Sequence, residues 1–291
     1  MNEETPIPVR LAAGVYFKNE VVQYWTEQTD EPIIQDESTY VIHQQDKDLV
    51  RNLIIDVIAS VPENIQLTLA LALKVIVKSD FPERWSGIVE KIALLVQSNN
   101  SQQIGGGLVA FYSLVKPFEY RNADKKASLI EAMKLLNPLL YQLLSNLLSD
   151  LSEQSVKYQK SLVKSIYRLI MHTVPTVFFT KEEFTKWLQL IVQILERPLP
   201  DSVANVDPDE RRELCYFKNK KWAIHFVVKI FERYGGPKTC QKPHKAFAKW
   251  FLDNFSVGLL NVIMKMLEQH SQTGIYTPRI VQECINYFNS A

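Results

Sequence analysis

The sequence predicts an all-α protein, built as a linear array of antiparallel helix pairs. No segment shows the apolar–polar alternation of a β-strand, whereas helical periodicity covers most of the chain. Prolines, glycines and polar turns separate the helical segments, so that helix pairs recur roughly every 40 to 60 residues. This spacing is typical of helical solenoids, and the 291-residue chain accommodates about five and a half such pairs.

The first predicted helix runs from Pro8 to Trp25 and is apolar around most of its circumference. Its initial proline suits the first turn of a helix. Only Arg10, Gly14 and Lys18 form a strip without bulky apolar side chains, at spacing i, i+4, i+8. A helix this apolar must lie between neighbours. We therefore expect the chain to begin on the second helix of a pair, with apolar faces uncovered on its first and last helices.

Ten further helices are predicted from apolar periodicity and from the residues that end helices. The polar stretches 26–40 and 197–215 are expected to be surface loops, and Pro138 is expected to kink or interrupt its helix. The predicted helices span about 42–61, 63–78, 84–96, 101–116, 125–151, 155–174, 182–195, 216–234, 243–270 and 278 to the last residue.

Composition and charge indicate a soluble, intracellular protein. The net charge of +1 gives no overall attraction to nucleic acid or to anionic membranes. The three cysteines, Cys215, Cys240 and Cys284, are widely spaced and odd in number, which favours a reducing compartment. The start of the chain is acidic and polar rather than a signal peptide. Thr68 and Lys74 interrupt the most apolar run, so no membrane insertion is expected.

Basic side chains recur at helical spacing on the predicted second helices. Like charges at such spacing repel one another by a few tenths of a kcal/mol, so the helices themselves gain nothing from them. One interpretation is a solvated face with lysine stems lying over apolar neighbours; the other is a surface for a partner with acidic or polar groups. The residues are Arg10, Lys18, Lys74, Lys78, Lys157, Lys160, Lys164, Arg168, Lys218, Lys221, His225, Lys229 and Arg233.

The sequence contains no constellation that indicates catalysis or a cofactor. The run 105–107 of three glycines lacks the lysine and hydroxyl residue of a phosphate loop, and is expected to let two helices approach closely. Cys240 and His244 would be only half of a zinc site. Four tryptophans at helical spacing among apolar residues are expected to pack in the core: Trp85, Trp187, Trp222 and Trp250.

Several motifs resemble those of importin-beta-type nuclear transport receptors. PVRLAAGVYFKNEVVQYW at 8–25 resembles the second helix of their first HEAT repeat, through Val9-Arg10, Ala12-Ala13, Lys18-Asn19 and Trp25. IHQQDKDLVRNLIIDVI and SDFPERWSGIV are similar to the helix and the turn that follow. NKKWAIHFVVKIFERYGGP and TPRIVQECINYF resemble the importin seven and importin eight branch of that family.

This resemblance implies a right-handed superhelical solenoid of HEAT repeats that continues beyond this chain. Residues 1–40 would be the C-terminal part of an N-terminal Ran-binding domain and contain the second helix of repeat 1. Residues 41–291 would form repeats 2 to 6, with the long loop near 197–215. Such receptors bind Ran-GTP through concave second helices, release import cargo, contact nucleoporins and shuttle between cytoplasm and nucleus. They need no cofactor of their own, because Ran holds the GTP.

The resemblance also suggests which residues contact Ran-GTP. Lys18 and Asn19 match the family motif, and Arg10 does too, with a structural role as its alternative. Lys74 and Lys78 lie at corresponding helix positions. The alternative for Asn19 is a buried amide bonded to a neighbouring repeat. Two other functions stay open: a protein scaffold, and a solenoid that binds nucleic acid. The low net charge and the few aromatic residues among the lysines disfavour binding to nucleic acid.

Overall fold

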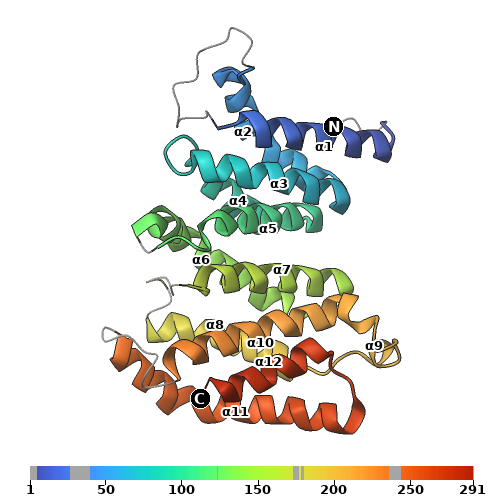
Figure 1. The fold of residues 1–291 in the computed structure, drawn as a ribbon, viewed down its shortest axis with the longest axis vertical. Helices are drawn as coiled ribbons and strands as arrows, with labels where there is room; N and C mark the ends of the chain where they lie inside the picture. Colours follow the sequence, from blue (N-terminus) through green and yellow to red (C-terminus); the bar gives the residue numbers. More distant parts are fainter. Residues whose placement is uncertain are drawn as a thin grey trace. The chain divides into compact units, whose positions relative to one another are not determined.

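The computed structural model describes residues 5–26, 40–122, 124–172, 177, 180–235 and 244–290. Within these ranges the regular structure is entirely helical (Figure 1). The chain divides into two compact units, Met1–Leu139 and Leu140–Ala291, which we call unit 1 and unit 2. The all-α prediction is therefore confirmed for the described residues, and no helix among them is long and apolar enough to cross a membrane.

Unit 1 is built from α1 (Ile7–Tyr24), α2 (Gln44–Ser60), α3 (Glu63–Asp80), α4 (Ile88–Val96), α5 (Ser101–Val115) and two 3-10 turns, η1 (Lys116–Phe118) and η2 (Asp124–Lys126). The helix α6 (Ala127–Leu147) begins in this unit and ends in unit 2. Local sequence explains several boundaries. Pro62 precedes α3, and the Asn100 side chain caps α5 by accepting hydrogen bonds from two backbone amides of its first turn.

The helices of unit 1 form two layers (Figure 1). Helix α3 packs against both α1 and α5, while α2 and α4 cover the other side of α5. A side chain at Gly106 would meet α2, since an added Cβ would lie 2.5 Å from the Cα of Ala59. The predicted close approach at the glycine run is therefore confirmed, and it occurs between α5 and α2.

Unit 2 repeats the same arrangement. Its helices are α7 (Glu153–Ile170), α8 (Lys181–Glu196), α9 (Asp201–Ala204), α10 (Cys215–Tyr234), α11 (Lys245–Thr273) and α12 (Pro278–Asn289), with the 3-10 turn η4 (Arg211–Glu213). Helix α10 lies between α7 and α12 in one layer and contacts α8 and α11 in the other (Figure 1). We call α1, α3, α5, α7, α10 and α12 the second helices.

The predicted helices agree with the observed ones to within a few residues at most boundaries. The prediction of a surface loop at 197–215 was wrong in part, because α9 and η4 lie inside this segment and Arg211 is buried there. Arg211 donates to the backbone oxygens of Val206 and Gly274, which fixes the segment against the α11–α12 turn. Helix α6 is continuous through Pro138, without the break that was one alternative. The uncovered apolar face expected on α1 is observed at Ile7, Val9, Val15, Tyr16 and Val22.

Candidate protein-binding surface on the second helices

The predicted contact residues of unit 1 lie on the neighbouring helices α1 and α3. Lys18 is half-buried on α1, and Lys78 is exposed near the end of α3. The Nζ atom of Lys74 lies 5.2 Å from the ring centroid of Tyr112 on α5. Burial lowers the pKa of Lys74, and the nearby charge of Lys116 lowers it further. Lys74 is therefore held against the α3–α5 junction, while Lys78 extends into solvent.

The other two predicted residues of α1 differ in their surroundings. Asn19 is exposed, so the alternative of a buried amide bonded to a neighbouring repeat is wrong. Arg10 is half-buried, and its Nε atom is buried without a hydrogen-bond partner among the described residues. Asn19 is thus accessible to a partner, whereas at least part of the Arg10 side chain belongs to the packing of α1.

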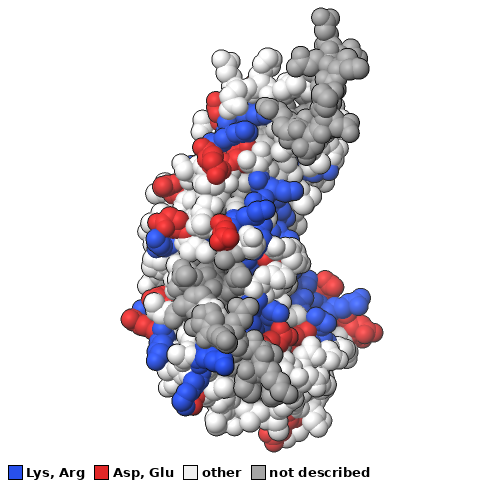
Figure 2. All heavy atoms as spheres, turned by 60° about the vertical axis from the view of Figure 1, so that its left-hand side comes forward, with Lys and Arg blue, Asp and Glu red and all other residues white. Residues whose placement is uncertain are grey.

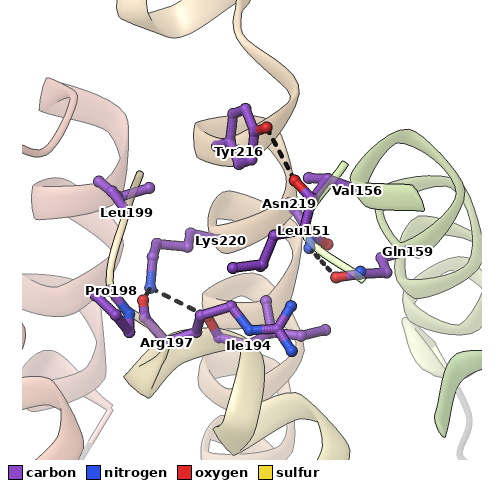
Figure 3. Close-up of a pocket in the computed structure, with 10 residues that line it drawn as sticks. All are labelled: Leu151, Val156, Gln159, Ile194, Arg197, Pro198, Leu199, Tyr216, Asn219 and Lys220. Carbon is purple, nitrogen blue, oxygen red and sulfur yellow. Dashed lines mark hydrogen bonds between the residues drawn. The ribbon is translucent and has the colours of Figure 1, made fainter. Parts of the chain in front are cut away.

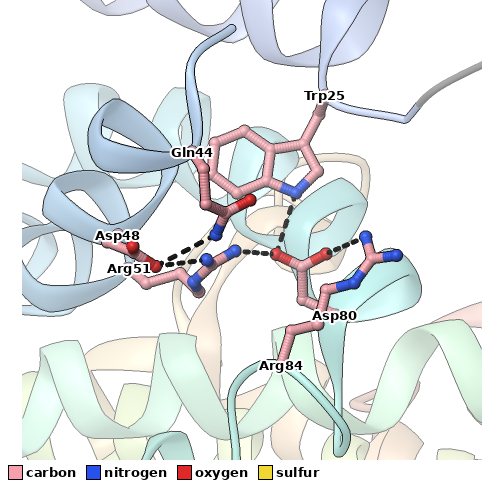
Figure 4. Close-up of polar contacts among 6 residues, drawn as sticks. All are labelled: Trp25, Gln44, Asp48, Arg51, Asp80 and Arg84. Atoms are coloured by element: carbon pink, nitrogen blue, oxygen red, sulfur yellow. Dashed lines mark hydrogen bonds and ion pairs between the residues drawn. The ribbon is translucent and has the colours of Figure 1, made fainter.

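A buried ionic network joins the end of α1, the middle of α2 and the end of α3 in unit 1 (Figure 4). The carboxylate of Asp80, whose side chain is 1% exposed, accepts hydrogen bonds from Trp25 Nε1 at 3.1 Å and from Arg51 Nη1 at 2.5 Å. Arg51 also pairs with Asp48 at 2.5 Å, and Arg84 lies 3.9 Å from Asp80. The network fixes the end of α3, and with it the positions of Lys74 and Lys78.

This network was missed from the sequence, although its residues carry a recognisable signal. Asp80 follows Ile76 and Val77 on the apolar face of α3. Likewise, Arg51 precedes the isoleucines on the buried face of α2. A charged residue on an apolar face must be paired when it is buried. The sequence does not show which residue is the partner, because the contacts span 29 and 55 positions.

In unit 2, three lysines of the predicted basic stripes are paired with glutamates of nearby turns. Lys157 pairs with Glu153 at 2.8 Å, Lys218 with Glu213 at 2.9 Å, and Lys229 with Glu232 at 2.8 Å. These pairs neutralise much of the local positive charge. The interpretation of a solvated face therefore suits these three positions better than a partner surface does.

Four of the remaining stripe residues, Lys164, Arg168, Lys221 and His225, lie around Trp222 on α10. The charged groups of Lys164, Arg168 and Lys221 lie 5.6, 5.3 and 5.2 Å from its ring, within the range of cation–π contacts. The ring centroids of Tyr167 and His225 are 5.4 and 5.3 Å from that of Trp222. Trp222 is half-buried, so its expected place in the core was wrong. Trp250 is half-buried too, so the same prediction was wrong for it, whereas Trp85 and Trp187 are buried as expected.

His225 does not add charge to this basic face, contrary to the sequence-based interpretation. Burial lowers its pKa to about 4, and the charges of Arg279, Lys221 and Arg168 contribute to the lowering. Its ring is therefore neutral near pH 7. Its Nδ1 atom lies 3.5 Å from Glu283 of α12, which itself pairs with Arg279 at 2.9 Å.

Polar side chains beneath this face tie α10 to α7. Asn219 Nδ2 donates to Gln159 Oε1 at 3.0 Å, and both residues are buried (Figure 3). Near the other end of α10, Arg233 Nη2 donates to the carbonyl oxygen of Met171 at 2.7 Å. Arg233 therefore takes part in the packing of α10 on the end of α7, rather than only in the basic stripe.

Lys220 is buried on the opposite side of α10 and caps the end of α8 (Figure 3). Its Nζ atom donates to the carbonyl oxygens of Ile194, Leu195 and Arg197 at 3.0, 2.6 and 2.6 Å. Burial lowers its pKa to about 7. The adjoining pocket has a volume of only about 20 Å³, enough for a single water molecule and too small for a cofactor.

Figure 2 shows lysine and arginine side chains in small groups, separated by acidic and uncharged residues on the face drawn. Among the described residues, no cluster of histidine, cysteine and carboxylate side chains is arranged to hold a metal ion. Cys240, half of the zinc site considered above, lies outside them.

Comparison with known proteins agrees with the sequence motifs. The importin-beta N-terminal domain matches residues 1–60. Importin-8 of Homo sapiens is 35% identical over 289 residues, which is 99% of this chain and 28% of that protein. An importin beta-like SAD2 homolog of Arabidopsis thaliana is 26% identical over 287 residues, or 98% of this chain and 27% of that protein. The chain thus spans little more than a quarter of these relatives.

Among solved structures, the exportin Cse1 in its cargo-free, cytoplasmic state has a TM-score of 0.77. The match covers 99% of this chain and 30% of that chain at 16% identity, and therefore concerns the fold alone. It confirms the expected HEAT-repeat solenoid. The sequence similarity to importin-8 proteins confirms the resemblance that the motifs indicated. By its sequence, the chain belongs to the importin-beta family.

Proposed function

We propose that this chain is part of a nuclear import receptor, and that it binds Ran-GTP through the second helices of unit 1. The observation that carries the proposal is the placement of the motif residues: Asn19 and Lys78 are accessible on the packed helices α1 and α3. Lys18 and Lys74 lie half-buried on the same two helices. Binding of Ran-GTP would release import cargo, as the family resemblance implies.

The remaining assignments follow from this role. Residues 1–40 would contain the second helix of a first repeat, and residues 41–291 would form repeats 2 to 6. Import cargo and nucleoporins would be further partners, and the receptor would move between cytoplasm and nucleus. No enzyme activity or cofactor belongs to this proposal, because the named relatives are importins and the GTP is held by Ran.

The test is a binding measurement between the full chain and Ran, loaded either with a non-hydrolysable GTP analogue or with GDP. We expect binding to the GTP form to be at least tenfold tighter, a difference of about 1.4 kcal/mol. The double variant Lys74→Glu, Lys78→Glu should weaken binding to the GTP form about tenfold or more, because a basic surface becomes acidic. Circular dichroism would verify that its helicity is unchanged.

A matched control is Lys134→Glu on α6, an exposed lysine of unit 1 that lies outside the second helices. This variant should change Ran affinity less than twofold. Equal affinity for both nucleotide states, or no binding by a folded sample, would count against the proposal. Equal affinity for both states would instead favour a protein scaffold.

A further inference from the structure

We propose that Leu67 and Leu71 of α3 make an apolar contact with the same partner that Lys74 and Lys78 attract, so that this partner presents an apolar side chain beside its acidic groups. We call these four residues the α3 face. The inference rests on the proposed function, because it takes Ran-GTP as the partner of α3. It adds that the contact is apolar as well as ionic.

The leucines of α3 fall into two sets. Leu69 and Leu73 are 3% and 0% exposed and pack in the core of unit 1. Leu67 and Leu71, by contrast, are 58% and 48% exposed. Leucines scattered singly over a surface are common and need no explanation. These two lie four residues apart and are therefore neighbours on the helix surface, so that together they form one apolar contact area.

The two lysines continue this apolar pair along the same side of the helix. Positions 67, 71, 74 and 78 are spaced four, three and four residues apart, which places all four on one helix face. The centre of the lysine pair is displaced from that of the leucine pair by about 10 Å along the helix axis. A partner that engages the whole α3 face must therefore present an apolar side chain and, at a similar distance from it, acidic groups.

Helix α2 carries a similar pair of leucines without the basic continuation. Leu49 and Leu53 are 56% and 48% exposed and also lie four residues apart. The next positions on that face are Asp56 and Ser60, and Asp56 pairs with Lys91 at 2.6 Å. A partner with acidic groups beside an apolar side chain therefore matches α3 in charge and does not match α2.

The lysines of the α3 face are available to such a partner. Neither Lys74 nor Lys78 forms an ion pair with another residue of the described ranges. Lys74 Nζ lies 5.2 Å from the ring centroid of Tyr112, and the buried carboxylate of Asp80 fixes the end of α3. Because the helix is held in place before a partner arrives, little ordering of the backbone opposes binding.

The experiment measures the affinity of the full chain for Ran, loaded with a non-hydrolysable GTP analogue, at several salt concentrations. The double variant Leu67→Gln, Leu71→Gln keeps helix propensity, since glutamine and leucine are similar in this respect. It should weaken binding about tenfold, because the burial of two half-exposed leucines is lost. Its salt dependence should match that of the unchanged chain, whereas Lys74→Glu, Lys78→Glu should make the dependence shallower.

The matched control is Leu49→Gln, Leu53→Gln on α2, which has the same spacing and nearly the same exposure. It should change the affinity by less than about twofold, as surface substitutions outside a contact do. Helicity and the urea unfolding midpoint would verify that both double variants are folded. The single variant Leu67→Gln, at the more exposed position, should still weaken binding about threefold.

The outcomes separate this inference from the function on which it rests. If the unchanged chain binds Ran-GTP and the α3 leucine variants bind as tightly, the apolar contact is overturned while the proposed function stands. An equal loss in the α2 and α3 double variants would also overturn it, because the effect would not belong to the α3 face. No binding of Ran-GTP by the folded, unchanged chain would overturn the proposed function and this inference with it.

Discussion

The two units have the same helical architecture, but different polar groups hold their second helices in register. In unit 1 a buried ion pair, Arg51 with Asp80, joins α2 to α3 and also engages Trp25 beyond α1. In unit 2 the buried side-chain pair between α7 and α10 is neutral, formed by the amides of Gln159 and Asn219, and Arg233 adds a hydrogen bond to the carbonyl oxygen of Met171. Helix packing in both units thus leaves room for a buried polar pair between helices. It does not determine whether that pair is charged or neutral.

The outward faces of the second helices differ as well. On α3, exposed Leu67 and Leu71 precede the lysines, so that apolar and basic positions follow one another along the helix. On α7 and α10 the basic side chains gather around an aromatic ring. Each unit has its own buried polar contacts between helices. The side chains on the outward face of a second helix can therefore differ from one unit to the other. The outward faces of α3 and of α7 and α10 thus differ in chemistry although their helices pack alike.

The largest difference in stability between corresponding variants of the two units is expected from a substitution of Asp80. Asp80→Ala leaves the buried guanidinium of Arg51 with only the exposed Asp48 as counter-charge, and should lower the free energy of unfolding by about 3–5 kcal/mol. The corresponding change in unit 2, Asn219→Ala, removes a neutral hydrogen bond and should cost only about 1–3 kcal/mol. Urea denaturation of both variants measures the difference.

Hydrogen exchange would locate each effect, because protection should fall in α1–α3 for Asp80→Ala and in α7–α10 for Asn219→Ala. Asp56→Ala is the surface control, since Asp56 forms a half-exposed pair with Lys91 at 2.6 Å and should cost about 1 kcal/mol or less. If Asp80→Ala were no more destabilising than Asp56→Ala, the ionic network would not be the link that we describe.

These buried links also mark the limit of what the sequence can predict. Most helix boundaries follow from local signals, such as Pro62 before α3, Asn100 at the start of α5 and Gly274 after α11. The short α9 was missed, because four residues do not establish a helical period. The pairing of Gln159 with Asn219 spans 60 residues, so it depends on how whole helices pack rather than on any local pattern.

The candidate sites show the same division. The basic stripes were visible as spacing, because residues three and four apart share a helix face. The sequence did not reveal which lysines pair with glutamates and which surround Trp222, since rotamers and neighbouring helices decide it. Lys220 could have been recognised, because Phe217 and Ile224 flank it at i−3 and i+4 on an apolar face. A lysine on such a face needs buried acceptors.

Replacing a helical glycine by alanine is expected to change the free energy of unfolding by a smaller amount, and in opposite directions in the two units. Gly106→Ala in unit 1 places a Cβ 2.5 Å from the Ala59 Cα, so α5 must move away from α2, at a cost of about 1–3 kcal/mol. Gly258→Ala lies inside α11 of unit 2 and meets nothing within 4 Å. It should stabilise the chain by about 0.5–1 kcal/mol through helix propensity.

Thermal unfolding of both variants tests this contrast, with a lower midpoint expected for Gly106→Ala and a higher one for Gly258→Ala. Gly106→Ser serves as a second variant and should destabilise at least as much, since it adds the same Cβ. A midpoint for Gly106→Ala equal to that of the unchanged chain would show that the α2–α5 approach is not close enough to exclude a side chain.

The last effect concerns Lys220, a buried lysine of unit 2, and appears as a pH dependence of the free energy of unfolding. The folded chain releases this proton near pH 7, whereas an unfolded lysine keeps it to about pH 10.4. Between these values the unfolded state binds more protons, so the free energy of unfolding rises with pH, by about 2 kcal/mol from pH 7 to pH 9. Below pH 7 both states are protonated, and the cost of burying the ammonium group remains in full.

Lys220→Met removes this titration together with the three hydrogen bonds to the end of α8. Urea unfolding at intervals from pH 6 to pH 9 should therefore show the unchanged chain gaining stability relative to the variant as the pH rises. Lys265→Met, an exposed position, should show no such relative change. Parallel pH profiles for the chain and Lys220→Met would mean that Lys220 keeps its proton when folded. Its three carbonyl acceptors would then outweigh the cost of burial, and unit 2 would depend on a buried charge just as unit 1 does.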